Sequence, residues 1–179
     1  MKLKKGYVAL FQYGSNMLPA RLNSSDRLSG RALLPSSARL GGWGVRFNLY
    51  SRCNGCGVTN IVSAKREYVL GVVYQVPVRL IYAPEGRRSR MDKIEGARPN
   101  GTGNYERRMV KIITMRGEAI LAATYIGTKN GRKRFSDRSQ KERRVSREYF
   151  SYVLKGARRF GLPTDYVSYL RRQAGPLKD

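Results

Sequence analysis

Short stretches that are either alternately apolar and polar or continuously apolar follow one another along the first two-thirds of the chain, which predicts a succession of β-strands. The alternation is clearest over residues 43–50, where every second residue is large and apolar: Trp43, Val45, Phe47 and Leu49. This pattern is typical of a strand with one buried face. Further strands are expected at residues 7–12, 32–40, 58–64, 68–76, 105–114 and 119–126, the last two joined by a hairpin turn at Arg116-Gly117.

The last third of the chain changes to a helical pattern. Residues 146–160 have one apolar face, formed by Tyr149, Val153, Ala157 and Phe160. Ser146 is placed to cap the start of this helix, and Gly161 is placed to end it. A second helix is expected from Pro163, a short one over residues 17–22 and a helical turn over 91–95. Neither a repeat nor a linker divides the sequence, so we expect one domain over residues 1–179.

Two stretches are unusually basic. Residues 77–99 follow the strand-ending Pro77 and carry six arginine or lysine side chains, which predicts an inserted surface loop before the helical turn. Between Lys129 and Arg147 nine residues are lysine or arginine, and only two are acidic. Because almost nothing apolar interrupts them, we expect a solvated loop or arm.

The composition supports a globular protein with anionic partners. With 179 residues, 41% of them hydrophobic, the chain is long enough to bury a sizeable core. Lysine and arginine number 36 against 12 aspartate and glutamate, a formal net charge of +24. Such a charge favours association with anions, and that association should weaken as salt rises.

Several kinds of catalytic site are excluded by the residue inventory. The chain has no histidine, which rules out histidine metal sites, Ser-His-Asp triads and Cys-His pairs. Cys53 and Cys56 are compatible with a redox pair, a small disulfide or half of a shared zinc site. A reduced loop is favoured, because a zinc site needs about four ligands and no others are evident. We expect neither a metal nor a cofactor.

The N-terminus and the hydropathy indicate a cytoplasmic protein that does not enter the membrane. Residues 1–5 are basic like the start of a signal peptide, but the apolar run that follows is too short. No segment approaches the roughly 20 apolar residues of a membrane span.

The loop Tyr13-Gly14-Ser15-Asn16 is the first candidate for a binding site. It lies between the expected strand 7–12 and the expected helix 17–22. Gly14 permits a tight or positive-φ bend, and backbone amides at the start of a helix can converge on an anion. Turns of this composition are also common as plain connections.

Three separated motifs together resemble one protein family. They are Tyr13-Gly14-Ser15-Asn16-Met17, Met91-Asp92-Lys93-Ile94-Glu95-Gly96, and Gly156-Ala157 followed by Gly161-Leu162-Pro163 and Tyr166. The matching stretch Gly71-Val72-Val73-Tyr74 and Tyr105 lie between these motifs. Together they occur over residues 10–170 in the same order as in the gamma-glutamylcyclotransferase-like family, which the sequence therefore resembles. The resemblance implies an α+β fold, a small mixed β-barrel with surrounding α-helices and a pocket at one barrel mouth.

The resemblance also implies an activity and its residues. Members of the family cyclise a γ-glutamyl group to 5-oxoproline and release an amine or amino acid, and Glu95 falls on the catalytic acidic position. The implied substrate-binding residues are Leu10, Phe11, Gln12, Tyr13, Gly14, Ser15, Tyr105, Tyr125 and Tyr149. A carboxyl group in such a pocket would have a raised pKa suited to proton transfer. Without the resemblance, Glu95 would be read as an ordinary carboxylate at a helix end and the tyrosines as core aromatics.

The charge supports a rival hypothesis of another class. A non-catalytic module that binds a polyanion such as nucleic acid would reuse the fold, and the basic insertions at about 77–99 and 129–147 would supply its contacts. The same insertions, if near the pocket mouth, would also suit an anionic substrate.

Overall fold

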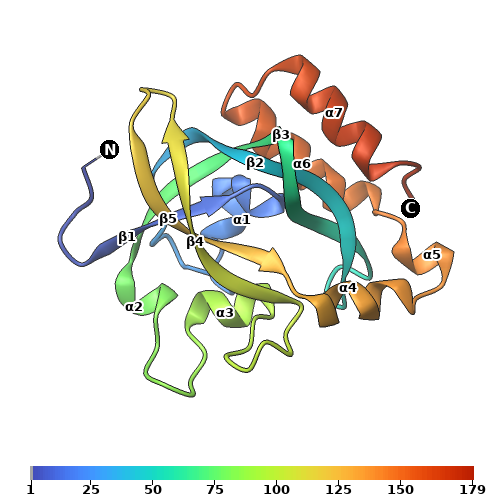
Figure 1. Ribbon diagram of the computed structural model, residues 1–179, viewed down its shortest axis with the longest axis horizontal. Coiled ribbons are helices and arrows are strands. Elements are labelled where there is room, and N and C mark those ends of the chain that lie inside the picture. Colours follow the sequence, from blue (N-terminus) through green and yellow to red (C-terminus); the bar gives the residue numbers. More distant parts are fainter. Residues whose placement is uncertain (1) are drawn as a thin grey trace.

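A computed structural model describes residues 2–179 (Figure 1). Within them, strands β1 (Tyr7–Gln12), β2 (Leu33–Ser51), β3 (Cys56–Pro77), β4 (Tyr105–Thr114) and β5 (Ala119–Gly127) form a closed barrel in the order β1-β3-β2-β4-β5. The pairs β1–β3, β2–β3, β2–β4 and β4–β5 are antiparallel. Strand β1 closes the barrel by pairing in parallel with β5 at Leu10 and Ala123. The expected α+β fold with a mixed barrel is confirmed.

The expected boundaries inside β2 and β3 were wrong. Each strand was predicted as two pieces, and each is continuous, so that β2 and β3 form one long ribbon. At Gly41-Gly42 the pairing register shifts before Trp43, and Gly42 has a φ of 80°. A glycine at positive φ lets a strand carry an irregularity and bend without leaving the sheet. The ribbon ends at the pair Ser51 and Cys56, so Cys56 belongs to β3.

Helices surround the barrel. They are η1 (Ser15–Met17), α1 (Pro19–Leu22), α2 (Val78–Ile81), α3 (Arg90–Glu95), α4 (Lys129–Ser136), α5 (Gln140–Arg143), α6 (Arg147–Arg159) and α7 (Thr164–Ala174). The predicted cap of α6 is confirmed, since Ser146 Oγ accepts a hydrogen bond from the Tyr149 amide at 3.1 Å. Among the helices of residues 2–179, none has both the length and the apolar character needed to cross a bilayer.

The segment between Lys129 and Arg147 was expected to be a solvated loop or arm, and it instead contains the helices α4 and α5. Thr128 Oγ1 accepts from the Gly131 amide at 2.9 Å and caps α4. Ser139 and Glu142 form a reciprocal capping box at the start of α5. Lysine and arginine favour helices almost as well as alanine, so a basic stretch with such caps can form helices where it packs against the barrel.

The segment 77–99 is also more ordered than the predicted surface loop. It opens with α2, in which Leu80 and Ile81 are buried, and it ends with α3 at the expected helical turn. Ser89 caps α3, and Gly96 ends it with a φ of 69° in the left-handed region. The apolar residues of α2 explain the difference, because their burial anchors the first turn after Pro77.

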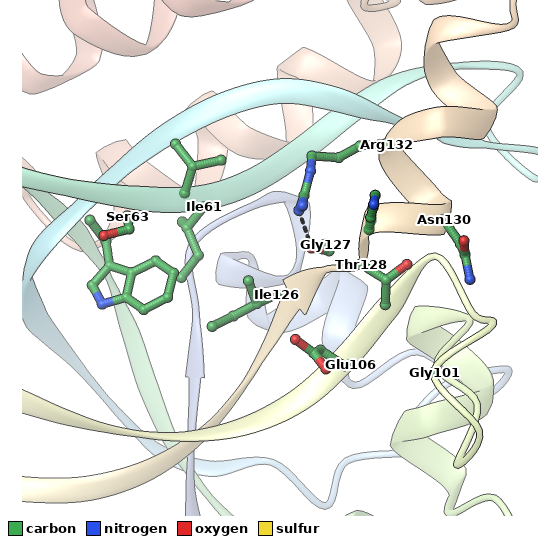
Figure 2. A pocket seen from close by; sticks show the side chains of 12 residues that line it. Ile61, Ser63, Gly101, Glu106, Ile126, Gly127, Thr128, Asn130 and Arg132 are labelled. Carbon is green, nitrogen blue, oxygen red and sulfur yellow. Dashed lines mark hydrogen bonds between the residues drawn. The ribbon is translucent and has the colours of Figure 1, made fainter.

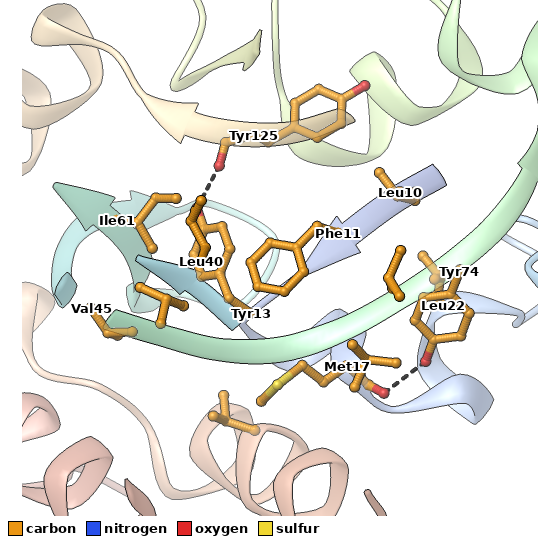
Figure 3. Close-up of a cluster of buried hydrophobic side chains, with 14 of the residues drawn as sticks. Leu10, Phe11, Tyr13, Met17, Leu22, Leu40, Val45, Ile61, Tyr74 and Tyr125 are labelled. Atoms are coloured by element: carbon orange, nitrogen blue, oxygen red, sulfur yellow. Dashed lines mark hydrogen bonds between the residues drawn. The ribbon is translucent and has the colours of Figure 1, made fainter. Parts of the chain in front are cut away.

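The barrel core holds the loop that follows β1 in place. Leu10 and Phe11 are fully buried in this core, together with Met17 and Tyr74 (Figure 3). Tyr74 Oη donates to the Met17 carbonyl oxygen at 2.7 Å. On the other side, a Cβ at Gly156 of α6 would lie 2.8 Å from the Cβ of Met17, so only glycine lets α6 pack this closely on η1. The loop at residues 13–16 is therefore held between the core and α6.

Candidate active site

A small polar pocket lies at the end of β1. It is lined by Gln12, Tyr13, Gly14, Ser15, Asn16, Thr59, Glu95, Tyr105, Tyr125 and Tyr149. These residues come from β1, η1 and the loop before it, and from β3, α3, β4, β5 and α6, so only the folded barrel assembles them. The cavity volume is about 30 Å³, enough for about two water molecules.

Glu95 points into this pocket and bonds to the loop after β1. Asn16 Nδ2 donates to Glu95 Oε1 at 2.9 Å. The amide oxygen of Asn16 accepts from Arg27 Nη1 at 3.0 Å. A chain of two hydrogen bonds thus joins the Arg27 guanidinium, the buried Asn16 amide and the Glu95 carboxylate.

Burial raises the pKa of Glu95 above its ordinary value of 4.5. The hydrogen bond from Asn16, the positive charge of Arg27 and a hydrogen bond from Gln12 act in the opposite direction, and burial outweighs them. A carboxylate whose pKa is raised is a stronger base than an ordinary carboxylate, and it can take up a proton and return it within one reaction. The arrangement suits a group that both takes and returns a proton.

Thr59 joins two of the pocket tyrosines. Its hydroxyl lies 2.9 Å from Tyr149 Oη, and its amide donates to the same oxygen at 3.2 Å. Tyr105 Oη donates to the Thr59 carbonyl oxygen. Burial raises the pKa of both Tyr105 and Tyr149, which keeps their hydroxyl groups neutral and able to donate hydrogen bonds.

The remaining two tyrosines of the lining are also tied to neighbours. Tyr13 Oη donates to the Tyr125 carbonyl oxygen, a bond drawn in Figure 3. Tyr125 Oη donates to Asp92 Oδ1 at 2.8 Å. The Tyr125 hydroxyl is therefore engaged by a residue of α3 outside the pocket lining.

Asp92 holds α3 in the position that presents Glu95 one turn later. Its carboxylate accepts from the Ser89 amide at 3.0 Å and from Arg107 Nη1 at 3.0 Å, in addition to Tyr125. Asp92 was not singled out from the sequence. The sequence did contain a signal for this role of Asp92. Asp92 follows Ser89 by three residues, which is the spacing of a capping box.

Gly14 is required for a different reason than predicted. Of the two expected conformations, a tight bend or a positive-φ bend, the second is absent, since the φ of Gly14 is −116°. A Cβ built on Gly14 would lie 2.1 Å from Thr59 Oγ1 and 3.4 Å from Tyr149 Oη. The loop therefore needs glycine because β3 and α6 approach its backbone so closely.

The structure brings most of the predicted site residues together. Glu95 and the predicted residues Gln12, Tyr13, Gly14, Ser15, Tyr105, Tyr125 and Tyr149 share the pocket lining. Leu10 and Phe11 are the exceptions, since their side chains are fully buried in the core (Figure 3) and they are absent from the lining. Two lining residues were missed as site residues. Asn16 belonged to the loop motif, whereas Thr59 carried no signal in an ordinary strand pattern.

Metal ligands do not gather at this pocket. Across residues 2–179 no group of three or more cysteine, aspartate or glutamate side chains is placed to hold a metal ion. Cys53 is exposed and Cys56 is buried, and both are free thiols. Ser146 Oγ donates to Cys56 Sγ at 3.4 Å, which places Cys56 at the start of α6.

Solved structures with the same fold include a gamma-glutamyl cyclotransferase, with a TM-score of 0.68, 22% identity and coverage of 97% of this chain and 94% of that one. A human protein described as uncharacterized protein loc79017 has a TM-score of 0.66 and 21% identity over 98% of this chain and 95% of its own. A yeast gamma-glutamyl cyclotransferase specific to glutathione has a TM-score of 0.61 and 14% identity, covering 95% and 96%. At these identities the likeness shows the fold.

No curated protein sequence matches the chain. The model of the AIG2-like family matches residues 68–170, a stretch that runs from β3 through α3 with Glu95 to α7. This match covers more than half of the sequence. The protein therefore belongs to the AIG2-like family and has the fold of the gamma-glutamyl cyclotransferases.

Proposed function

We propose that the protein is an enzyme that cyclises a γ-glutamyl group to 5-oxoproline and releases an amine or amino acid. The observation that carries the proposal is the Glu95 carboxyl group, held by Asn16 inside a pocket lined by tyrosines. The names of the structural neighbours support the same reaction, since two of them are gamma-glutamyl cyclotransferases.

In the proposed reaction the α-amine of the substrate attacks its own γ-carbonyl carbon. Glu95 takes one proton from the α-ammonium group, the new C–N bond forms and the carbonyl oxygen gains negative charge. Glu95 returns this proton to the departing nitrogen, and the bond from the γ-carbonyl carbon to that nitrogen breaks as the carbonyl group re-forms. The ring nitrogen then loses its second proton to the released amine, so that the products are the neutral lactam and an ammonium ion. Backbone amides of Gly14 and Ser15 would stabilise the substrate carboxylate or the developing oxyanion.

The size of the pocket adds one requirement. A γ-glutamyl group is larger than the present cavity of about 30 Å³, so side chains of the lining must rotate when a substrate enters. The Gln12 side chain is unbranched and flexible, and it is the candidate for this movement, whereas the hydrogen bond from Asn16 keeps Glu95 in place. Once the pocket is filled, contacts with its walls would fold the substrate into the geometry for ring closure.

The test is product release from a panel of γ-glutamyl dipeptides and γ-glutamylamines, with 5-oxoproline identified by mass. The Glu95→Gln variant, purified in the same way, measures the background from contaminating enzymes. Turnover of at least one substrate above that background is expected. An enzyme that turns over no member of the panel would refute this substrate class.

We propose polyanion binding as a second function, because a specific surface favours it. Exposed cations follow one another along α4 and α5, and within the described chain no acidic side chain pairs with Lys133, Arg134, Lys141, Arg143 or Arg144. Mobility shifts of DNA and RNA across a salt series would test this, and affinity should fall steeply as salt rises. Absence of binding at low salt would refute it.

A further inference from the structure

A second, larger cavity opens at the end of the barrel beside α4 (Figure 2). Its volume is about 640 Å³, within the roughly 300–1,000 Å³ of small-molecule sites. The cavity exists because β2 and β4 pair only at Ala38 with Thr114 and Arg39 with Ile113. Beyond those pairs the β2–β3 ribbon and the β4–β5 hairpin separate. The lining includes Trp43, Ile61, Glu106, Ile126, Lys129 and Arg132.

This cavity has a lining of its own, separate from the candidate active site. The Gly127 amide donates to Asn60 Oδ1 at 2.7 Å, and Asn60 Nδ2 donates to Asn48 Oδ1 at 2.9 Å, which ties β5 to the β2–β3 ribbon. Along β4 and β5, Tyr105 and Tyr125 line the small pocket, whereas the next residues, Glu106 and Ile126, line the large cavity. The proposed cyclisation makes no use of this second space.

The lining combines an apolar wall with a cationic edge. Trp43, Ile61 and Ile126 supply aromatic and aliphatic surface. At the α4 edge, Arg132 Nη1 donates to the Gly127 carbonyl oxygen at 2.5 Å. Figure 2 shows this bond beside Thr128 and Asn130. Lys129 adds a second cation there. The one carboxylate of the lining, Glu106, is paired with Arg108 at 2.9 Å. A flat apolar group joined to an anion matches this combination.

The cationic edge continues into the basic surface of α4 and α5. Lys129 and Arg132 belong to the first turn of α4, the exposed Lys133 and Arg134 follow, and Lys141, Arg143 and Arg144 lie on and just after α5. We propose that the cavity receives one base of a single-stranded nucleic acid whose phosphates lie along α4 and α5. The proposal rests on the polyanion binding proposed above and adds the base site.

A single strand is specified because a base inside a duplex is stacked on both faces and paired along its edge. An unpaired base can leave the strand and stack on an aromatic side chain, and every base offers a face for such stacking. A polyanion without bases would use the cations of α4 and α5 and leave the cavity empty.

Trp43 reports on the cavity directly, because it is the only tryptophan of the chain. Its fluorescence should be quenched in a saturable manner by a short single-stranded DNA oligonucleotide. Inorganic polyphosphate, titrated to the same degree of saturation, should leave the fluorescence almost unchanged. The two titrations are matched in saturation, and only the oligonucleotide carries bases.

Variants separate stacking from charge, with the oligonucleotide labelled for anisotropy. Trp43→Leu should weaken single-strand binding by about 5- to 150-fold, the range for stacking one base on one ring, while Trp43→Phe keeps most of the affinity. The affinity for polyphosphate, obtained from its competition with the labelled oligonucleotide, should be equal for both variants. The double variant Lys133→Gln/Arg134→Gln should weaken the binding of every polyanion. The control double variant Arg171→Gln/Arg172→Gln removes the same charge from α7 and should weaken that binding less.

The outcomes distinguish the proposals. If oligonucleotide and polyphosphate bind equally and leave Trp43 fluorescence unchanged, the base site is wrong and polyanion binding remains. If no polyanion binds, both are wrong, whatever the cyclotransferase assay shows. Should Trp43→Leu fail to fold by circular dichroism, the fluorescence titration of the unaltered protein still decides.

Discussion

Asn16 donates a hydrogen bond of 2.9 Å to Glu95, a residue 79 positions further along the chain. The bond connects the loop after β1 to the last turn of α3, two elements that the barrel core and Asp92 hold independently. It fixes one oxygen of the carboxylate and leaves the group inside the pocket. The predictions that follow depend on this geometry and on the contacts that support it.

Glu95→Gln should lower the rate of 5-oxoproline release by roughly 10²- to 10⁴-fold. Glutamine keeps the volume and the hydrogen bond to Asn16, but it cannot take a proton from the α-ammonium group. Substrate binding, followed by calorimetry, should change little. Glu85→Gln is the matched control, since Glu85 is an exposed residue ten positions earlier. Full activity in the Glu95→Gln variant would show that Glu95 is not the base.

The pH profile should show the raised pKa of Glu95. Only the ionised carboxylate accepts a proton, so kcat/KM should rise with pH through an apparent pKa above the ordinary 4.5. The hydrogen bond from Asn16 lowers this pKa, and Asn16→Ala should therefore move the acidic limb to higher pH. Rate profiles of the two proteins provide the comparison, and a limb that stays in place or moves to lower pH would contradict the assignment.

Gly14→Ala should destabilise the protein by about 1–3 kcal/mol, the usual cost of overpacking. The φ of −116° is open to alanine, so the cost comes from the contact of 2.1 Å between the new Cβ and Thr59 Oγ1. Denaturant unfolding would measure the change. Thr59→Ala removes that oxygen, and the double variant should recover part of the lost stability. Additive losses in the double variant would show that the contact with Thr59 is not the cause.

Asp92→Ala should cost about 3–5 kcal/mol of unfolding free energy, because it leaves Arg107 and Tyr125 without their buried partner. The Asp92 and Arg107 side chains are 10% and 27% exposed. Glu106→Ala breaks a matched ion pair with Arg108, whose side chains are 37% and 61% exposed, and should cost at most about 1 kcal/mol. Equal losses in the two variants would mean that the Asp92 network does not stabilise α3 as described.

Replacing both Cys53 and Cys56 with serine should leave turnover and thermal stability nearly unchanged. Cys53 is exposed, and a serine at position 56 can still accept the hydrogen bond from Ser146. Metal analysis of the purified protein accompanies the variant. Stoichiometric zinc, or loss of activity in the double variant, would show that the pair has a role.

Much of the barrel could be predicted from short-range patterns. Strand β1 follows from its continuous apolar run, and the β4–β5 hairpin follows from two strand-like stretches joined at Gly117. Helix α6 follows from its apolar face and from Ser146. Such signals are readable because period and caps are properties of neighbouring residues. Helices α4 and α5 were missed because the charge of their residues was given more weight than the caps at Thr128 and Ser139.

What the sequence by itself determined is the order of most elements, the likeness to one family and the position of Glu95 within a motif. Only the tertiary structure decided that Asn16 bonds to Glu95, that Thr59 joins the tyrosines and that Leu10 and Phe11 belong to the core. It also decided that Gly41-Gly42 continues a strand, since pairing with β3 extends on both sides. The physical reason is that these contacts join residues far apart in the chain, and no local pattern of polarity encodes which of them meet.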